Sequence, residues 1–160
     1  MPTTKIDLGK NVRGDMAGIL NKRLADAIDL SAQCKQAHWN VKGPQFIALH
    51  ELFDQLYANV VGYIDTLAER ITALGEVANG TIQTVAKTSS LPAYPVDLAS
   101  GHDHVDRLSA AFAAFAKAAR KDIDTADEAG DAVTADVLTG VVRGIDKDLW
   151  FLDAHLGAKA

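Results

Sequence analysis

Four side chains of types that bind metal ions, one histidine and three carboxylates, occur as two pairs with four-residue spacing. The pairs are His50 with Asp54 and Asp65 with Glu69. At about 100° per residue, all four fall within an arc of about 100° on one helix. His50 and Asp65 are nevertheless 15 residues apart, or about 22 Å along a straight helix, whereas metal–ligand bonds are about 2.0–2.2 Å long. One helix therefore cannot bring all four to one metal ion.

The two pairs are placed symmetrically about a point between Asn59 and Val60. A second copy of the helix, running antiparallel about that point, would set the first pair of one chain against the second pair of the other. Between the pairs, the same face holds the small apolar residues Ala58, Val61 and Gly62, which allow another helix to approach closely. The pattern predicts a metal site shared by two identical subunits across an isologous interface.

His38 is a fifth candidate ligand, on the apolar seam of the preceding helix. A short turn at Gly43 and Pro44 would bring that helix beside the one that carries the two pairs. Taken alone, His38 also fits a buried core histidine, and the pairs also fit ordinary surface groups. Asp65 and Glu69, however, are like charges one turn apart, which repel on an isolated helix, so a bound cation would remove that repulsion.

The ligand types narrow the choice of metal. Imidazole with carboxylates suits Fe(II), Mn or Zn, and the lack of thiolates in the set disfavours Cu(I) and iron–sulfur clusters. Four-helix proteins with a di-iron centre inside one bundle use paired Glu-x-x-His motifs, and this sequence contains none. These observations favour a centre shared between subunits over one enclosed in a single bundle.

The residues around these candidates have the periodicity of helices. Apolar positions recur at steps of three and four residues, and the prolines lie outside the periodic segments. The pattern predicts four long helices, over about residues 15–42, 45–77, 103–125 and 134–156. Between the second and third lie roughly 20–25 residues, with a short helix at 81–86. Two helix pairs joined by one long connection predict an all-α, ferritin-like four-helix bundle over residues 15–157, preceded by a flexible tail over residues 1–14.

The composition is that of an ordinary globular domain: of 160 residues, 48% are hydrophobic and 23% are charged. No apolar run approaches the roughly 18 residues that suggest a membrane-spanning helix, and the first residues lack a secretory apolar region. The single cysteine, Cys34, allows no disulfide within the chain, in keeping with a reducing cytoplasm. A formal net charge of −5 argues against a uniformly basic nucleic-acid binder.

Several longer runs resemble the Dps family, the bacterial mini-ferritins that protect DNA. The runs are KQAHWNVKGPQF at residues 35–46, LHELFD at 49–54, DTLAER at 65–70 and DKDLWFL at 146–152. The resemblance extends over nearly the whole chain. It implies a spherical dodecamer around a hollow iron store, with ferroxidase sites between subunits and hydrogen peroxide as the preferred oxidant. It also implies a bacterial, cytoplasmic location close to the nucleoid.

The same resemblance assigns roles to residues of this chain. It implies a two-iron Fe(II)/Fe(III) site shared across a two-fold subunit interface, with the ligands His38, His50, Asp54, Asp65 and Glu69. Trp39 matches a family tryptophan beside the site; an aromatic core residue is the alternative, and the two roles are compatible. All five ligand positions agree with the family pattern.

Charge and position single out two further groups. Acidic residues gather around the start of the last helix, where the family has iron pores at three-fold axes, and Asp131 and Asp136 are the pore candidates; the helix dipole also favours acids there. Lys5, Lys10 and Arg13 are candidate DNA contacts, whose weak effects would add up in an oligomer. The alternatives are a chiefly structural, nucleoid-compacting DNA-binding protein with minor iron chemistry, and an enzyme that uses manganese or another metal.

Three other residues receive structural roles. His104, near the start of the third long helix, is expected at the surface or as a cap. Cys34 and Trp150 are expected in the core of the bundle.

Overall fold

The computed structural model describes residues 4–157, and these residues form five helices with no strand beyond one isolated bridge. The helices are α1 (Lys10–Asn40), α2 (Phe46–Ala73), α3 (Ile82–Thr88), α4 (Gly101–Glu128) and α5 (Ala132–Asp153). The all-α prediction and the short helix in the long connection are confirmed.

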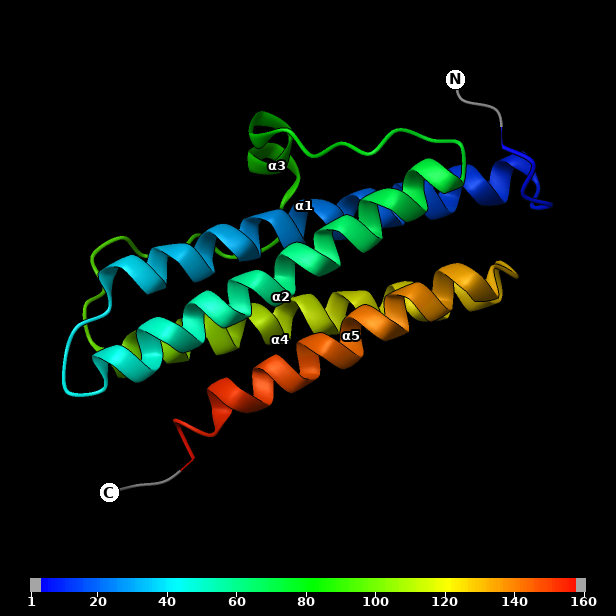
Figure 1. Cartoon of the computed structure of the whole chain (residues 1–160). Coiled ribbons are helices and arrows are strands. Elements are labelled where there is room, and N and C mark those ends of the chain that lie inside the picture. The colour runs from blue at the N-terminus through cyan, green and yellow to red at the C-terminus, as the bar shows by residue number, and fades with distance from the viewer. Residues whose placement is uncertain (1–3, 158–160) are drawn as a thin grey trace.

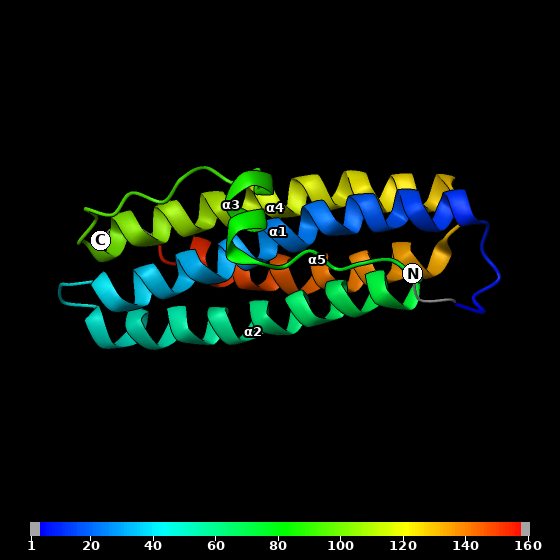
Figure 2. The same ribbon diagram turned by 90° about the horizontal axis from the view of Figure 1, so that it is seen from above.

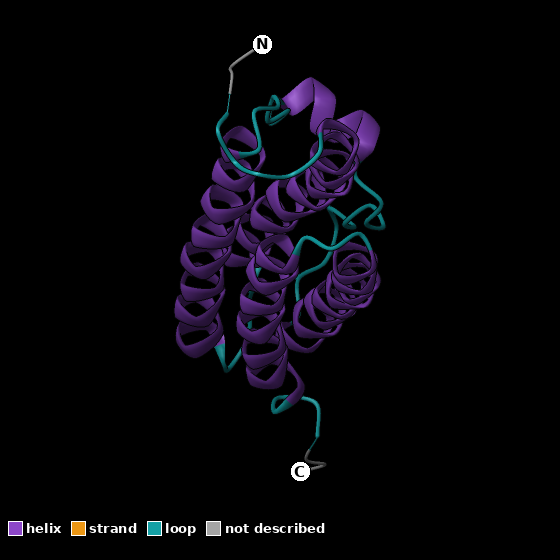
Figure 3. Ribbon diagram, turned by 90° about the vertical axis from the view of Figure 1, so that its right-hand side faces the viewer, coloured by secondary structure: helices purple, strands orange, loops and turns teal. Residues whose placement is uncertain are grey.

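Two helical hairpins make the bundle. α1 packs along α2 and α4 packs along α5, and the long connection between the hairpins carries α3 (Figure 1). Seen from above, α3 lies over α1, outside the four long helices (Figure 2). Figure 3 shows helices and loops only, with loop segments along the side of the bundle as well as at its ends. This is the up-and-down pairing with one long crossover that is typical of the ferritin-like arrangement.

The four long helices bury a continuous apolar core. Its largest members, among them Phe53, Phe112 and Phe115, are fully buried. Burying one such side chain contributes about 1.5–3 kcal/mol. The core therefore fixes the rotation of α2 about its axis, and with it the direction in which the opposite, exposed face of α2 points.

α1 begins at Lys10, about five residues before the predicted start near residue 15. The early start is stabilised from outside the helix, because the Arg13 guanidinium donates to the carbonyl oxygens of Leu8 at 3.2 Å and Leu74 at 3.1 Å. Such a tertiary contact leaves no signal in the local periodicity. The predicted tail is thus helical from Lys10 onward, and its first three residues lie outside the described part of the chain.

The long connection is held against α1 by two carboxylates, of which one, Asp26, is buried. Asp26 is fully buried and accepts hydrogen bonds from the Ser90 backbone N–H at 2.7 Å and the Ser90 hydroxyl at 2.9 Å. The Asp29 carboxylate accepts from the Ser89 hydroxyl at 2.6 Å, and Arg23 lies 3.4 Å from Asp26. A polar group buried without a partner is costly, so these bonds hold the connection against the hairpin.

His104 lies in the protein interior, where it is 1% exposed, so the surface assignment for this residue is wrong. Its Nε2–H donates to the carbonyl of Leu98 at 3.1 Å, and its Nδ1 accepts from the Tyr94 hydroxyl at 2.6 Å. Both partners belong to the long connection, whose path over α4 was not predictable from local sequence. Burial lowers the pKa of His104, which keeps the ring neutral and able to accept from Tyr94.

A polar cluster fixes α2 against α5. Asp148 is 4% exposed and accepts hydrogen bonds from Asn59 at 2.8 Å and from the Tyr63 hydroxyl at 3.1 Å. A Cβ on Gly144 would lie 2.6 Å from Cζ of Tyr63, so glycine is what lets the Tyr63 ring reach across to α5. Burial raises the pKa of Asp148 and of Tyr63.

Within residues 4–157, none of the helices has the length and apolar character that crossing a bilayer requires.

Candidate metal centre

Two of the predicted ligands, His38 and His50, face each other where α1 and α2 pack together. The Nδ1 of His38 lies 2.6 Å from the backbone oxygen of His50, and the Nδ1 of His50 lies 2.7 Å from the backbone oxygen of His38. A carbonyl oxygen can only accept, so both Nδ1 atoms carry the proton. These two bonds fix the tautomer of each ring. In each ring Nε2 is unprotonated and its lone pair is free, as in histidines that bind metal ions.

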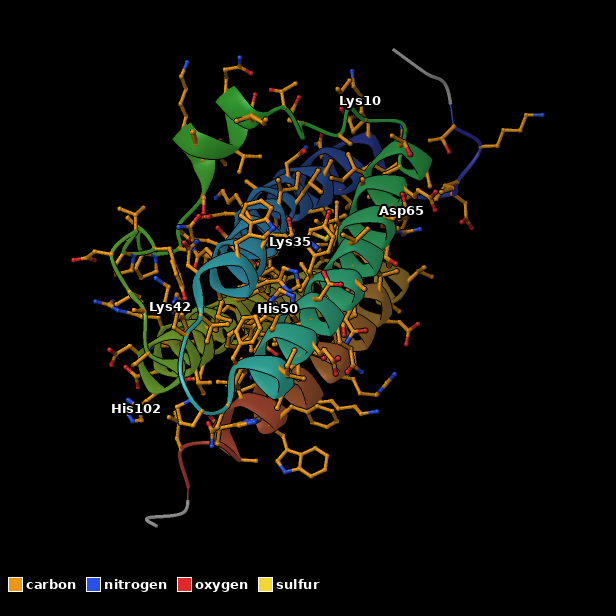
Figure 4. All side chains as sticks on the ribbon, turned by 60° about the vertical axis from the view of Figure 1, so that its left-hand side comes forward. Lys10, Lys35, Lys42, His50, Asp65 and His102 are labelled. Atoms are coloured by element: carbon orange, nitrogen blue, oxygen red, sulfur yellow. The ribbon has the colours of Figure 1, made fainter. Side chains whose placement is uncertain are left out.

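The two rings are also stacked, with centroids 3.7 Å apart and planes 17° from parallel. The Phe46 ring at the start of α2 lies 5.0 Å from the His50 ring. Hydrogen bonds at Nδ1 and the stacked faces leave each ring little freedom to turn. Figure 4 shows His50 on α2 beside the stretch of α1 that carries Lys35.

Asp54 lies one turn beyond His50 and makes an ion pair with Lys35 of α1. The hydrogen bond from Lys35 lowers the pKa of Asp54, so the carboxylate is ionised at neutral pH. His38, His50 and Asp54 line one surface hollow, together with Gln55 and Ala58 among its other residues. The structure thus brings three of the five predicted ligands to one place.

Asp65 and Glu69 lie further along the same helix, and both are exposed (Figure 4 labels Asp65). Their carboxylates make no hydrogen bond or ion pair within residues 4–157. Nor do the described residues contain three His, Cys, Asp or Glu side chains grouped closely enough to hold a metal ion. A single chain therefore offers two partial ligand sets on one face of α2, the situation that the spacing predicts.

The face between the two partial sets is open and apolar. Val61 is 42% exposed, and Ala58 and Gly62 beside it are exposed as well. Ile47, at the start of the same helix, is 61% exposed. An exposed apolar patch such as that of Ala58, Val61 and Gly62 is typical of a surface that contacts another protein.

Two tryptophans expected in or near the core lie at the surface. Trp39 is 68% exposed, next to His38 at the end of α1, so the core alternative for this residue is wrong. Trp150 is 64% exposed, so its core assignment is wrong too. Both occupy helix positions that point away from the bundle interior. The core expectation for them followed from the apolar character of the indole ring, not from these positions.

The two pore candidates differ sharply. Asp131 is 2% exposed; its carboxylate accepts from the Arg70 guanidinium at 3.0 Å and caps α5 by accepting from the Thr134 N–H at 3.0 Å. Burial opposes ionisation, but the bonds from Thr134 and Arg70 outweigh it and lower the pKa of Asp131. This placement makes Asp131 a structural residue, because a pore carboxylate must face solvent. Asp136 is exposed, as a pore carboxylate must be.

The three candidate DNA contacts also differ in their exposure to solvent. Lys5 and Lys10 are exposed, at the segment before α1 and at its first residue. Arg13 is partly buried, and its guanidinium donates hydrogen bonds to the Leu8 and Leu74 carbonyls. It therefore connects the start of α1 to the end of α2.

Lys35 is the residue of this site that the sequence did not single out. It precedes His38 by three residues, which places it on the same side of α1. That three-residue spacing is the one sequence signal for Lys35. Its pairing with Asp54 of α2 depends on how the two helices pack.

Comparison with known proteins agrees with this architecture. The model of the ferritin-like domain matches residues 17–159. A DNA protection during starvation protein of Agrobacterium fabrum is 49% identical over 157 residues, which are 98% of this chain and 97% of that protein. One from Brevibacillus brevis is 35% identical over 88% of this chain and 94% of its own length.

Solved structures give the same answer. The Dps of Mycobacterium smegmatis in its tetragonal form superposes with a TM-score of 0.92 at 33% identity, over 98% of this chain and 94% of that one. The Dps of Microbacterium arborescens in its high iron form gives a TM-score of 0.88 at 37% identity, over 97% and 99% of the two chains. The chain belongs to the ferritin-like proteins, and among them to the family of DNA protection during starvation (Dps) proteins.

Proposed function

We propose that this protein is a ferroxidase and iron store that oxidises Fe(II) at sites shared between two copies of the chain. Fe(III) then collects as mineral inside a hollow oligomer, and the removal of iron and peroxide protects DNA from oxidative damage. The proposal places the protein in the bacterial cytoplasm, close to the DNA.

The observation that carries the proposal is the mutual fixing of His38 and His50, because it presents two Nε2 lone pairs on the face that also holds Asp54. The unpaired carboxylates of Asp65 and Glu69 on the same helix complete the set once a second copy is added. Imidazole and carboxylate together suit Fe(II) as substrate.

In the proposed reaction, two Fe(II) ions bind side by side at each subunit contact. His38 of one chain, with Asp65 and Glu69 of the other, holds the first ion, while His50 and Asp54 hold the second. Glu69 lies between the two ions and bridges them. Each Fe(II) gives up one electron, and one hydrogen peroxide molecule accepts both and is reduced to two hydroxide ions. Taking the electrons in pairs avoids release of the hydroxyl radical.

A pair of conservative substitutions tests this chemistry. Asp65→Asn with Glu69→Gln should slow peroxide-dependent Fe(II) oxidation at least about tenfold, because two charged ligands are lost. The measurement is stopped-flow absorbance after anaerobic loading with Fe(II). An unchanged rate would contradict the assignment. Repeating the measurement with dioxygen, and with Mn(II) in place of Fe(II), tests peroxide preference and metal identity separately.

The assembly is part of the same proposal. The ligand geometry requires a two-fold dimer, and kinship with Dps proteins supports a dodecamer of six such dimers around the cavity. One solved relative is described as the Dps of Microbacterium arborescens in a high iron form. Native mass measured before and after loading with iron tests the oligomer, and a monomer with full activity would refute the shared site.

A further inference from the structure

The stretch between α2 and α3 contains the only Asn-Gly pair of the chain, Asn79 with Gly80. This stretch runs back along α1 from the end of α2 to α3 (Figure 1). Both residues lie in irregular backbone and are exposed. Neither the side-chain amide of Asn79 nor the backbone N–H of Gly80 makes a hydrogen bond within residues 4–157. The side-chain carbon of Asn79 and the nitrogen that can attack it are therefore neighbours in an accessible loop.

The other four asparagines of the chain lack this combination. All four lie in helices, and closing a ring between the side chain and the next backbone nitrogen would force the backbone out of its helical dihedral angles. Three of them are followed by valine, whose branched Cβ crowds that nitrogen. The side-chain amides of Asn21, Asn40 and Asn59 are also held by hydrogen bonds.

The backbone before Asn79 is clamped to α1 by one side chain. The Asn21 amide donates to the Val77 carbonyl at 3.0 Å, and its oxygen accepts from the Asn79 backbone N–H at 2.9 Å. Gly80 also approaches α1, because a Cβ added to it would lie 3.3 Å from Cδ1 of Ile28. These contacts fix the chain up to the Asn79 nitrogen, and the next peptide bond carries no such restraint.

We propose that Asn79 is a site of spontaneous deamidation, whose isoaspartate product loosens the connection from α1. The Gly80 backbone nitrogen attacks Cγ of Asn79, a succinimide ring closes, and the amide nitrogen leaves as ammonia with the proton of the attacking nitrogen. Water then opens the ring at either carbonyl and gives aspartate or isoaspartate. The net reaction is the hydrolysis of one amide by one water molecule. Glycine favours it, because no Cβ shields the attacking nitrogen or restricts the backbone.

The products change the charge and the path of the chain. Either product adds one negative charge to a chain whose formal net charge is −5. Isoaspartate also inserts one extra carbon into the main chain between Cα of Asn79 and the nitrogen of Gly80. That carbon displaces Gly80 from Ile28 and weakens the bond between the Asn79 N–H and Asn21, so this stretch opens more often.

The test is peptide mapping by mass spectrometry of the assembled protein during incubation at physiological temperature, at neutral and at mildly alkaline pH. Labelling by an isoaspartate-specific methyltransferase identifies the isoaspartate. Gly80→Ala keeps Asn79 and adds a Cβ beside the attacking nitrogen, and its close contact is the flexible end of the Ile28 side chain. Asn11 is the matched internal control, because it is an exposed asparagine in α1 followed by Val12.

We expect the Asn79 peptide to gain, over days, the mass that replacing an amide NH2 by OH adds, while the Asn11 peptide stays unchanged. The gain should be faster at alkaline pH, because the attacking nitrogen must lose its proton. Gly80→Ala should slow it at least about fivefold. If the amide of Asn79 persists as long as that of Asn11, or is lost equally fast in Gly80→Ala, the proposed modification is wrong.

Hydrogen exchange measures the loosening of the connection. Residues 77–81 should exchange faster in the fraction that carries isoaspartate than in freshly purified protein, and incubated Gly80→Ala should exchange as it did before incubation. Equal exchange in the modified and fresh protein would overturn the loosening. None of these measurements involves iron, so their outcome and that of the proposed ferroxidase function are independent.

Discussion

His38 and His50 each donate the Nδ1 proton to the backbone oxygen of the other, at 2.6 and 2.7 Å, and their rings stack at 3.7 Å. Each histidine is thus both a candidate ligand and the support that orients the other. All the groups in this arrangement belong to the hairpin of α1 and α2 of one chain.

This mutual support predicts that the two histidines act as a unit. His38→Ala and His50→Ala should each weaken Fe(II) binding at least about tenfold, and the double variant should lose little more than either alone, because effects at contacting residues are not additive. Anaerobic calorimetry of the three variants measures the coupling. Strictly additive losses would show that the two rings bind independently.

The two acidic residues at the start of α5 should respond in opposite ways. Asp131→Ala removes a cap and leaves Arg70 without its buried partner, which should lower the free energy of unfolding by about 3 kcal/mol. Asp136→Asn, at an exposed position, should change stability by less than about 0.5 kcal/mol and slow iron uptake at low salt if it lines a pore. Chemical denaturation and uptake kinetics measure both, and a stable Asp131→Ala variant would contradict the structural assignment.

His104 should make the fold sensitive to mild acid. Burial lowers its pKa in the folded state, so below about pH 6.5 the unfolded chain binds more protons than the folded one. Stability contributed by neutral His104 is therefore present above that pH and falls as the pH drops toward the folded-state pKa. His104→Gln should be less stable at pH 8, by about 1–3 kcal/mol because Tyr94 and Leu98 lose a partner.

The same variant should lose less stability than the unmodified protein between pH 7 and pH 5. Thermal unfolding across that range checks the slope. Equal slopes in the two proteins would mean that another group carries the acid sensitivity.

The basic residues near the N-terminus should separate DNA binding from folding. Lys5→Gln with Lys10→Gln should weaken DNA binding at low salt at least about tenfold, since many copies of these lysines would act together on one DNA in the proposed oligomer. Arg13→Gln should leave DNA affinity unchanged and lower the melting temperature, because its guanidinium is engaged by two carbonyls. Gel shifts across salt concentrations measure the first effect. If the unmodified protein causes no gel shift even at low salt, it does not bind DNA.

A feature of the structure could be predicted from the sequence when the interactions that produce it lie close together along the chain. The bundle and the ligand face of α2 follow from the periodicity around His50 and Glu69, because one amphipathic helix fixes both. The early start of α1 depends on Arg13 reaching the Leu74 carbonyl, and the burial of His104 depends on the path of the long connection. Both are contacts between distant segments, which periodicity cannot report.

The features of the candidate site also fall into those that the sequence predicts and those that depend on how the helices pack. Spacing alone indicated that His50 and Asp65 cannot share a metal within one chain, a conclusion about distance along a helix. The pairing of Lys35 with Asp54, and the Nδ1 bonds that set both histidine tautomers, require the relative position of α1 and α2. The sequence therefore predicts which residues can serve as ligands, and the packing determines which atoms are free to bind.

Subunit mixing tests the central claim most directly. One parent carries His38→Ala with His50→Ala, and the other carries Asp65→Asn with Glu69→Gln, so each parent alone lacks half of every site. In a mixed dimer, one of the two shared sites is built only from intact halves. Statistical mixing should therefore restore about a quarter of the unmodified rate of peroxide-dependent Fe(II) oxidation, because half of the dimers are mixed. A mixture no more active than its parents would contradict a site shared between two chains.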